Sequence, residues 1–194
     1  MRVLELFSGT HSVGKVCNQL GYEVISLDLK NATINCNILN WDYKIYPVGH
    51  FDIVWASPPC STFSNLCESH KGRGKTNESI LNNINNIGLP ILRRTEEIIE
   101  YFKPNLWFIE NPQTGKMKNY MTKPFYDVDY CKYSDWGYRK RTRIWTNKES
   151  FNNKLCKKDC INMLNGKHSK DVSDRGIRFR YRIPELLIKD LFMQ

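Results

Sequence analysis

The sequence has no apolar run long enough to cross a bilayer, and its first residues, MRVLELFSG, show no signal-peptide pattern. Its seven cysteines are an odd number, and without a secretory signal they do not indicate a disulfide framework. These absences argue against a membrane protein and against a secreted, disulfide-bonded one. We therefore expect a soluble, intracellular, cytoplasmic chain with reduced thiols.

Acidic residues are scarce beside basic ones, because 29 Lys and Arg stand against 20 Asp and Glu, a net charge of +9. Basic residues gather at 70–75 (HKGRGK), 138–143 (YRKRTR) and 175–182 (RGIRFRYR), with aromatic residues among the second and third groups. Basic and aromatic side chains together suit a polyanion, above all nucleic acid. A solvated basic surface is the alternative interpretation.

The hydrophobic pattern predicts alternating strands and helices in one domain of ordinary size. Short apolar runs predict strands at 2–7, 22–28, 51–57 and 105–111, a late strand pair at 126–133 and 141–147, and helices at 11–21, 88–104 and 184–192. Such alternation favours an α/β fold with a mostly parallel sheet and helices on both faces. Residues 61–87 are predicted to form a long polar loop, and residues 148–175 show little periodicity.

Three predicted strands end in residues that suit a binding or catalytic site: Ser8-Gly9, Pro58-Pro59-Cys60 and Glu110-Asn111-Pro112. In parallel sheets, ligands lie beyond the carboxyl ends of the strands, so we expect these three ends at one edge. Gly9 permits a tight turn, and the helix that follows offers backbone amides to a ligand. Asp28, at the end of the second strand, is suited to bind ribose hydroxyls, although His11 replaces a glycine of the usual dinucleotide pattern.

Cys60 follows two prolines that stop the strand, and hydroxyl side chains surround it in the sequence WASPPCSTFS. A thiolate in this place could attack an electrophilic carbon, whereas most cysteines are small buried hydrophobes. Glu110 ends an apolar strand and is costly there without a task or a partner. Its alternative role is that of a cap or ion-pair acid.

The order of these pieces resembles the cytosine carbon-5 DNA methyltransferases. The resemblance rests on Phe-x-Gly at 7–9, the strand-end acid, Ser-Pro-Pro-Cys at 57–60, Glu-Asn at 110–111 and Arg-x-Arg at 141–143. It covers about residues 1–146 and returns at 181–192 (YRIPELLIKDLF). A full target-recognition domain is lacking, and 147–181 form a minimal insert in its place, as in small phage and viral methylases. The asparagine-rich composition also hints at a phage or viral source, whose protein would act in the host cell.

The resemblance implies a Rossmann-like methyltransferase fold, a single catalytic domain over 1–194, and S-adenosyl-L-methionine as cofactor. By resemblance, the cofactor-binding residues are Phe7, Ser8, Gly9, Thr10, His11, Ser12, Asp28, Leu29, Asn37, Ile38, Ser57 and Pro58. The family's usual acid at the adenine contact is replaced here by Asn37. The catalytic residues implied are Cys60, Glu110, Arg141 and Arg143.

The implied reaction transfers a methyl group to carbon 5 of cytosine through a covalent Cys60 adduct. Glu110 would hydrogen-bond the base, Arg143 would contact the base oxygen, and Arg141 would lie close to both the base and phosphate. DNA is the expected partner, an accessory protein for target recognition is allowed, and residues 70–78 are a candidate lid. Two alternatives stay open: the same chemistry on RNA, and a catalytically silent DNA-binding or regulatory module on the same fold.

A metal site is not predicted. Cys156, Cys160 and His168 are soft ligands at a spacing that suits zinc, but the sequence shows no evident fourth ligand.

Overall fold

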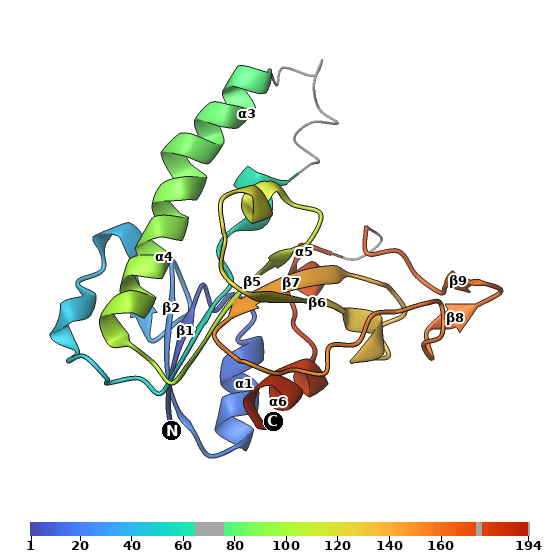
Figure 1. Ribbon diagram of the computed structural model, residues 1–194, viewed down its shortest axis with the longest axis horizontal. Coiled ribbons are helices and arrows are strands. Elements are labelled where there is room, and N and C mark those ends of the chain that lie inside the picture. Colours follow the sequence, from blue (N-terminus) through green and yellow to red (C-terminus); the bar gives the residue numbers. More distant parts are fainter. Residues whose placement is uncertain (65–75, 174–175, 194) are drawn as a thin grey trace.

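A seven-stranded sheet forms the centre of the molecule, which we describe from a computed structural model for residues 1–64, 76–173 and 176–193 (Figure 1). Its strands lie in the order β3-β2-β1-β4-β5-β7-β6. The five parallel strands are β1 (Arg2–Leu6), β2 (Glu23–Asp28), β3 (Ile34–Asn35), β4 (Ile53–Ala56) and β5 (Leu106–Pro112). β7 (Arg141–Thr146) runs antiparallel to both of its neighbours, β5 and β6 (Phe125–Asp129). The predicted α/β class with a mostly parallel sheet is confirmed.

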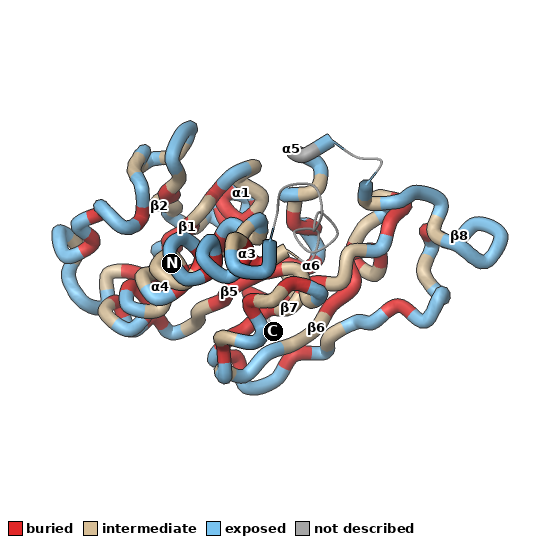
Figure 2. The backbone as a smooth tube through the Cα atoms, turned by 90° about the horizontal axis from the view of Figure 1, so that it is seen from above, coloured by how far each residue is buried: buried red, intermediate tan, exposed pale blue. Residues whose placement is uncertain are grey.

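Helices cover both faces of this sheet (Figure 1). On one face, α1 (Ser12–Gln19) and α6 (Glu185–Met193) contact each other and share a core with the sheet. On the other face, α4 (Leu89–Phe102) packs against a second core. Because side chains alternate along a strand, Val3 of β1 enters the first core and Leu4 enters the second. Figure 2 shows the buried residues along the central strands and the exposed ones in the outer loops.

The loop predicted at 61–87 is wrong for its second half. α3 (Asn77–Asn83) continues through a π-helical turn (Ile84–Gly88) into α4, and Figure 1 shows one long helix that projects beyond the sheet. Thr76 and Ser79 start this helix with a capping box. Burial of Ile80 and Ile84 outweighs the low helix propensity of the asparagines around them. None of the helices in the described ranges has the length and apolarity that a membrane crossing needs.

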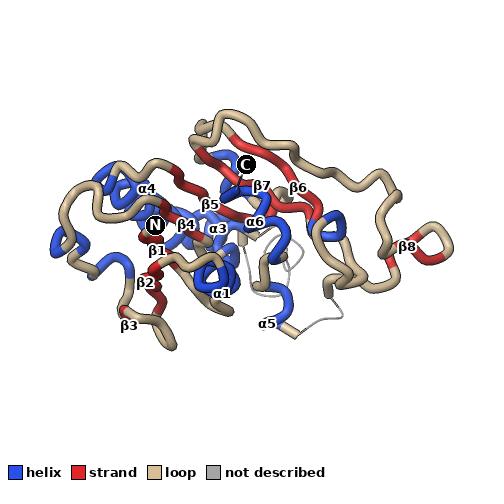
Figure 3. Tube along the Cα trace, turned by 90° about the horizontal axis from the view of Figure 1, so that it is seen from below, coloured by secondary structure: helices blue, strands red, loops and turns tan. Residues whose placement is uncertain are grey.

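The segment after β7 has little regular structure, as its weak periodicity predicted. Figure 3 shows mostly loop between β7 and the short helix α5 (Ile177–Arg180). A hairpin within it joins β8 (Met163–Leu164) to β9 (Lys167–His168). Asn165 and Gly166, both with positive φ, form the two-residue turn that favours such a hairpin. This segment lies beside the sheet because Asp129 at the end of β6 donates its backbone N–H to the Lys154 carbonyl at 3.1 Å.

Candidate active site

The three predicted strand ends lie at one edge of the sheet. β4 lies between β1 and β5, with Leu6, Ala56 and Ile109 side by side in the pairing register. The turn after β4 is fastened to the end of β5, because the Asn111 side-chain amide donates a hydrogen bond to the Pro58 carbonyl at 2.8 Å. The diproline turn and the Glu-Asn strand end are therefore held in direct contact.

Cys60 begins a short 3-10 turn (Cys60–Phe63) and is half-buried. Phe63 anchors this turn in the core against Gly88 of the long helix, where an added Cβ would come within 2.8 Å of the Phe63 ring. Burial raises the pKa of the Cys60 thiol above its ordinary value, and the Glu110 carboxylate raises it further, while Lys140 acts in the opposite direction. The thiol therefore lies within electrostatic reach of both charges, and its position is rigid.

Glu110 is buried, with 6% of its surface exposed, and two groups compensate its charge. The Tyr130 hydroxyl donates a hydrogen bond to Glu110 Oε1 at 3.1 Å, and Lys140 Nζ lies 3.6 Å from the same oxygen. Burial and the Glu110 charge raise the pKa of Tyr130, so its hydroxyl stays a donor. Because both of these contacts fall on Oε1, these two groups leave the second oxygen of Glu110 open to further hydrogen bonds.

Lys140 is the residue of this site that the sequence analysis missed. Its ammonium group donates to the Arg180 carbonyl at 3.1 Å and lies 4.8 Å from the centre of the Tyr130 ring. These contacts fix the cation beside Glu110 and join the site to α5. The available signal was strand alternation: Lys140 stands between Arg139 and Arg141, so its side chain points to the other face from theirs.

Arg141 and Arg143 are not brought together with Cys60 and Glu110. The register pairs Glu110 with Ile144 and Asn111 with Arg143, so the two arginines lie on the opposite face of the sheet from Glu110. Arg143 forms a two-pronged ion pair with Asp127 at 2.8 and 2.9 Å, and Arg141 forms one with Asp129 at 3.0 and 2.7 Å. Their predicted catalytic roles stay predictions, and in this structure both guanidinium groups have carboxylate partners.

The first loop turns sharply, with positive φ at Phe7, Gly9 and His11. The sequence predicted that the helix after this loop offers its first backbone amides to a ligand. Two of these amides are already occupied. Val13 and Gly14 donate their backbone N–H groups to Glu5, each at 3.1 Å. Burial raises the pKa of Glu5 to about 7, although these two hydrogen bonds lower it. A buried acid from β1 thus caps α1 internally.

Most of the predicted cofactor residues lie around this loop, and Ser8 and Asp28 have the clearest signs of a ligand. Asp28 accepts the Gly9 amide at 2.8 Å, which joins the ends of β1 and β2 and keeps its carboxylate at the strand end. Ser8 is buried, and its hydroxyl has no hydrogen-bond partner among the described residues. Such an orphaned group indicates a missing partner.

The other predicted cofactor residues take part mainly in local contacts. Ser12 accepts the Ile183 backbone N–H at 3.1 Å, and Asn37 caps the turn that contains buried Ile38. Ser57 accepts the Trp55 indole N–H at 3.0 Å, so its hydroxyl is already engaged. Further along, Leu29 is exposed, Thr10 hydrogen-bonds Ser12, and His11 contacts the Asn31 carbonyl. The candidate lid at 70–78 falls largely outside the described residues, which include only 76–78 of it.

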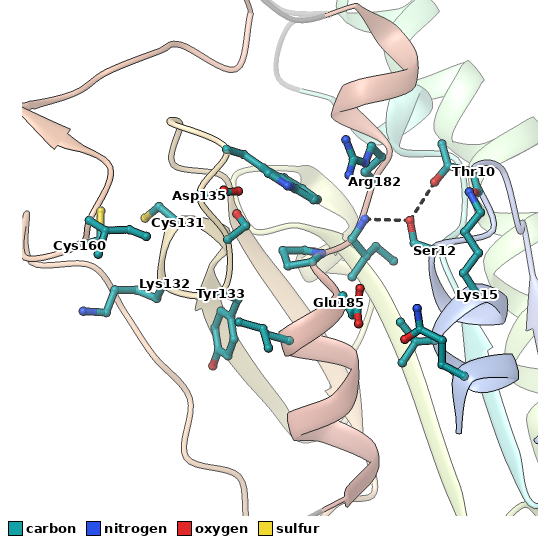
Figure 4. Close-up of a pocket in the computed structure, with 18 of the residues that line it drawn as sticks. Thr10, Ser12, Lys15, Cys131, Lys132, Tyr133, Asp135, Cys160, Arg182 and Glu185 are labelled. Atoms are coloured by element: carbon teal, nitrogen blue, oxygen red, sulfur yellow. Dashed lines mark hydrogen bonds between the residues drawn. The ribbon is translucent and has the colours of Figure 1, made fainter. Parts of the chain in front are cut away.

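A cavity of about 750 Å³ lies beside the site rather than at it (Figure 4). Thr10 and Ser12 line one end of it, Arg182 lines its middle, and Cys131 and Cys160 line the far end. Cys60, Glu110 and Lys140 are not among its lining residues. Its volume therefore does not identify the reaction centre, which the strand ends identify instead.

Comparison with curated proteins gives one strong match. The chain is 48% identical over 210 aligned positions to a protein of Frog virus 3 (isolate Goorha) that bears the name "Probable DNA (cytosine-5)-methyltransferase". The alignment covers 98% of each chain. The expected phage or viral kind of protein is confirmed by this relative. No family model matches the chain.

One solved structure supports the fold. The structure of the Entamoeba histolytica methyltransferase EhMeth aligns with 88% of this chain at a TM-score of 0.53 and 16% identity. The crystal structure titled as a putative DNA modification methyltransferase encoded within a prophage of E. coli aligns with 75% of this chain, at a TM-score of 0.47 and 11% identity. This chain spans about half the length of these two structures, 57% and 46% respectively. The predicted Rossmann-like methyltransferase fold is confirmed.

Proposed function

This chain belongs to the DNA (cytosine-5)-methyltransferase family, and from that premise we propose that it transfers a methyl group from S-adenosylmethionine to carbon 5 of cytosine in DNA. The observation that supports this most is the direct contact between the diproline turn that carries Cys60 and the strand end that carries buried Glu110, made by the Asn111 amide on the Pro58 carbonyl at 2.8 Å. The net charge of +9 supports a polyanionic substrate.

The proposed reaction begins with attack of the Cys60 thiolate on carbon 6 of a cytosine extruded from the duplex. The new carbon–sulfur bond makes carbon 5 nucleophilic. Glu110 stabilises the charge that develops by hydrogen-bonding the ring nitrogen and the exocyclic amine. After methyl transfer, loss of the proton from carbon 5 expels the Cys60 thiolate and restores the aromatic base.

Lys140 supplies the positive charge of this site in our proposal. It lies 3.6 Å from Glu110 and favours the ionised form of Cys60. The resemblance assigns base contacts to Arg143 and Arg141, but their bonds to Asp127 and Asp129 occupy them before DNA binds. Either arginine would have to leave a carboxylate partner to take that role, whereas Lys140 is already beside Glu110.

The residues around the first loop fit S-adenosylmethionine. The cofactor, when bound, supplies an electrophilic methyl group to carbon 5. Asp28 is suited to accept the ribose hydroxyls, and the unpartnered Ser8 hydroxyl supplies a further polar contact. In this proposal the cofactor lies between the first loop and Cys60, with Gly9 and Pro58 beside it.

We also propose that residues 147–181 replace the larger target-recognition domain of the family. The chain spans only about half of the solved structures that it matches, yet it covers 98% of the viral relative. A minimal recognition segment, or one completed by an accessory protein, accounts for both observations.

The test uses the purified full chain, methyl-tritiated S-adenosylmethionine, and duplex DNA and RNA of the same sequence. We expect label in DNA, at cytosines that bisulfite sequencing identifies. A duplex with 5-fluorocytosine at the target position should trap a covalent complex at Cys60, detected by mass spectrometry. The Cys17→Ala variant, altered at a cysteine of the α1 core, controls for nonspecific effects of thiol loss.

Three outcomes would overturn the proposal in different ways. Label in RNA alone would show that RNA, not DNA, is the substrate of the same chemistry. DNA binding without methyl transfer under saturating cofactor would show a catalytically silent DNA-binding module. Methyl transfer without any adduct would remove Cys60 from its role.

A further inference from the structure

We propose that Cys131, Cys156, Cys160 and His168 bind one structural zinc ion, which holds the segment after β7 against the sheet. This proposal does not depend on the methyltransferase activity. The four side chains come from three separate parts of the chain: the turn after β6, the loop at 156–160, and β9. Cys156, Cys160 and His168 are near one another in the sequence, whereas Cys131 is brought to them by the fold.

The distances among the four ligand atoms suit a tetrahedral site. A zinc ion with three sulfur ligands and one nitrogen ligand holds these atoms about 3.5 to 3.8 Å apart. His168 Nε2 lies 3.5 Å from Cys156 Sγ and 3.4 Å from Cys160 Sγ, and all four atoms lie within 4.8 Å of one another. Figure 4 shows the sulfur atoms of Cys131 and Cys160 close together at the far end of the cavity.

The ligand set is typical of structural zinc. Three thiols and one imidazole fill the four positions of a closed site, and the three residues between Cys156 and Cys160 fall within the usual spacing. The backbone turns sharply between these two cysteines, with positive φ at Lys158.

The surrounding segment needs such a support because it lacks an apolar core. Among residues 152–173, only Cys156 and Asn162 are buried. Ile161 is 85% exposed and Leu164 is 63% exposed. A segment with so little buried apolar surface is ordinarily held by a metal or a disulfide. Three neighbouring cysteines cannot all pair in disulfides, whereas one zinc ion uses all of them.

The cluster is joined to the sheet through polar contacts. The Asn162 side-chain amide donates to the carbonyl groups of Cys131 and Ser134 at 2.9 and 2.8 Å. Cys156 donates its backbone N–H to Asp129 at 2.8 Å, and the same carboxylate holds Arg141. The ion would therefore fix the edge of β6 and, through Asp129, the position of Arg141.

The test measures metal in the full chain. We expect about one zinc per chain after purification with reduced thiols, and less than a tenth of that in Cys156→Ser. The Cys17→Ala variant, altered in the α1 core, should keep the full zinc content. Replacement by Co²⁺ in the wild-type protein should give the intense visible absorption of a tetrahedral site together with a sulfur-to-cobalt charge-transfer band.

A second measurement keeps the proposal testable if Cys156→Ser does not fold. Zinc is removed from the wild-type protein by a chelator and then added back as Zn²⁺. We expect the apo protein to melt lower by about 10 °C and to recover on addition of one equivalent. Reduced wild-type protein that binds no zinc, a six-coordinate cobalt spectrum, or a disulfide among the three cysteines in reducing buffer would overturn the proposal.

Discussion

The molecule holds cysteines in two regions that differ in almost every physical respect. Cys60 stands alone after two prolines, beside a buried acid and a lysine, at the edge of a sheet with an apolar core on each face. Cys131, Cys156 and Cys160 lie together beside His168, in a segment with almost no apolar core. In our proposals, the first thiol performs chemistry on a fold that two apolar cores stabilise, and the other thiols stabilise their segment by binding zinc.

The same residue type serves two purposes in these places. A thiol that performs chemistry needs a rigid position and an open side, which the diproline turn and half-burial supply at Cys60. Thiols that stabilise structure need one another and exclusion from solvent, as at buried Cys131 and Cys156. Loss of a thiol should therefore affect activity alone in one region and stability first in the other.

The largest expected effect is that of Cys60→Ser. We expect methyl transfer to fall by at least about 10³-fold, because a serine hydroxyl is a far weaker nucleophile than a thiolate. The melting temperature and the affinity for DNA should stay close to wild type, since no core residue changes. Tritium transfer, thermal melting and DNA titration measure the three quantities. A variant that stayed active would contradict the role of Cys60.

Lys140→Met should have the second largest effect, a fall of about 10²-fold in the rate of methyl transfer. The substitution keeps the apolar length of the side chain and removes the charge beside Glu110. Arg143→Met is the matched comparison, since it removes the cation that pairs with Asp127 on the opposite face. We expect less than about tenfold loss of rate in that variant. A larger loss in folded Arg143→Met would show that Arg143 leaves Asp127 to contact the base.

The sheet and its site were predictable from the sequence to different degrees. Six of the seven strands of the sheet and the closing helix were predicted, most of them from short apolar runs that end near Gly, Pro or Asp. The two-residue strand β3 is too short to give such a run and was not predicted. Cys60 and Glu110 stood out because their residue types are unusual at strand ends. Lys140 could not be separated from its arginine neighbours by composition, and although alternation placed its side chain opposite theirs, only the structure shows that this is the side of Glu110.

The features that the sequence did not predict depend on contacts between residues that are distant in the chain. The helix at 77–88 was missed because asparagine lowers the helical signal, while the buried Ile80 and Ile84 that stabilise it have no mark of burial in the sequence. Cys131 was not weighed together with Cys156, Cys160 and His168, because a whole strand, β7, separates it from them. Both features depend on tertiary packing rather than on local sequence.

The pH dependence of alkylation should distinguish Cys60 from the three clustered cysteines. Because burial and Glu110 raise the pKa of Cys60, little thiolate is present at neutral pH. Its alkylation rate should therefore rise about tenfold per pH unit up to a pKa above the ordinary value. In Lys140→Met that pKa should be higher still and the rate at neutral pH lower. Peptide mapping by mass spectrometry gives the rate at each cysteine separately.

The cluster serves as the internal control for that measurement. With zinc bound, Cys131, Cys156 and Cys160 should resist alkylation across the same pH range, and chelation should make them reactive. If all four cysteines react equally before and after chelation, both the raised pKa of Cys60 and the zinc site are contradicted.

The smallest expected effect is on cofactor binding, through Asp28→Asn. An asparagine keeps one oxygen for the Gly9 amide, but it loses the oxygen that accepts the Leu29 amide and the negative charge that favours ribose hydroxyls. We expect affinity for S-adenosylmethionine to fall about tenfold, with DNA affinity unchanged. Asp52→Asn is the matched control, because Asp52 also accepts a backbone amide, that of Arg2 at 2.7 Å, but at the other end of the sheet. If calorimetry finds equal cofactor affinity in both variants, Asp28 does not bind the ribose. The cofactor would then occupy a different part of the edge at which the strands end.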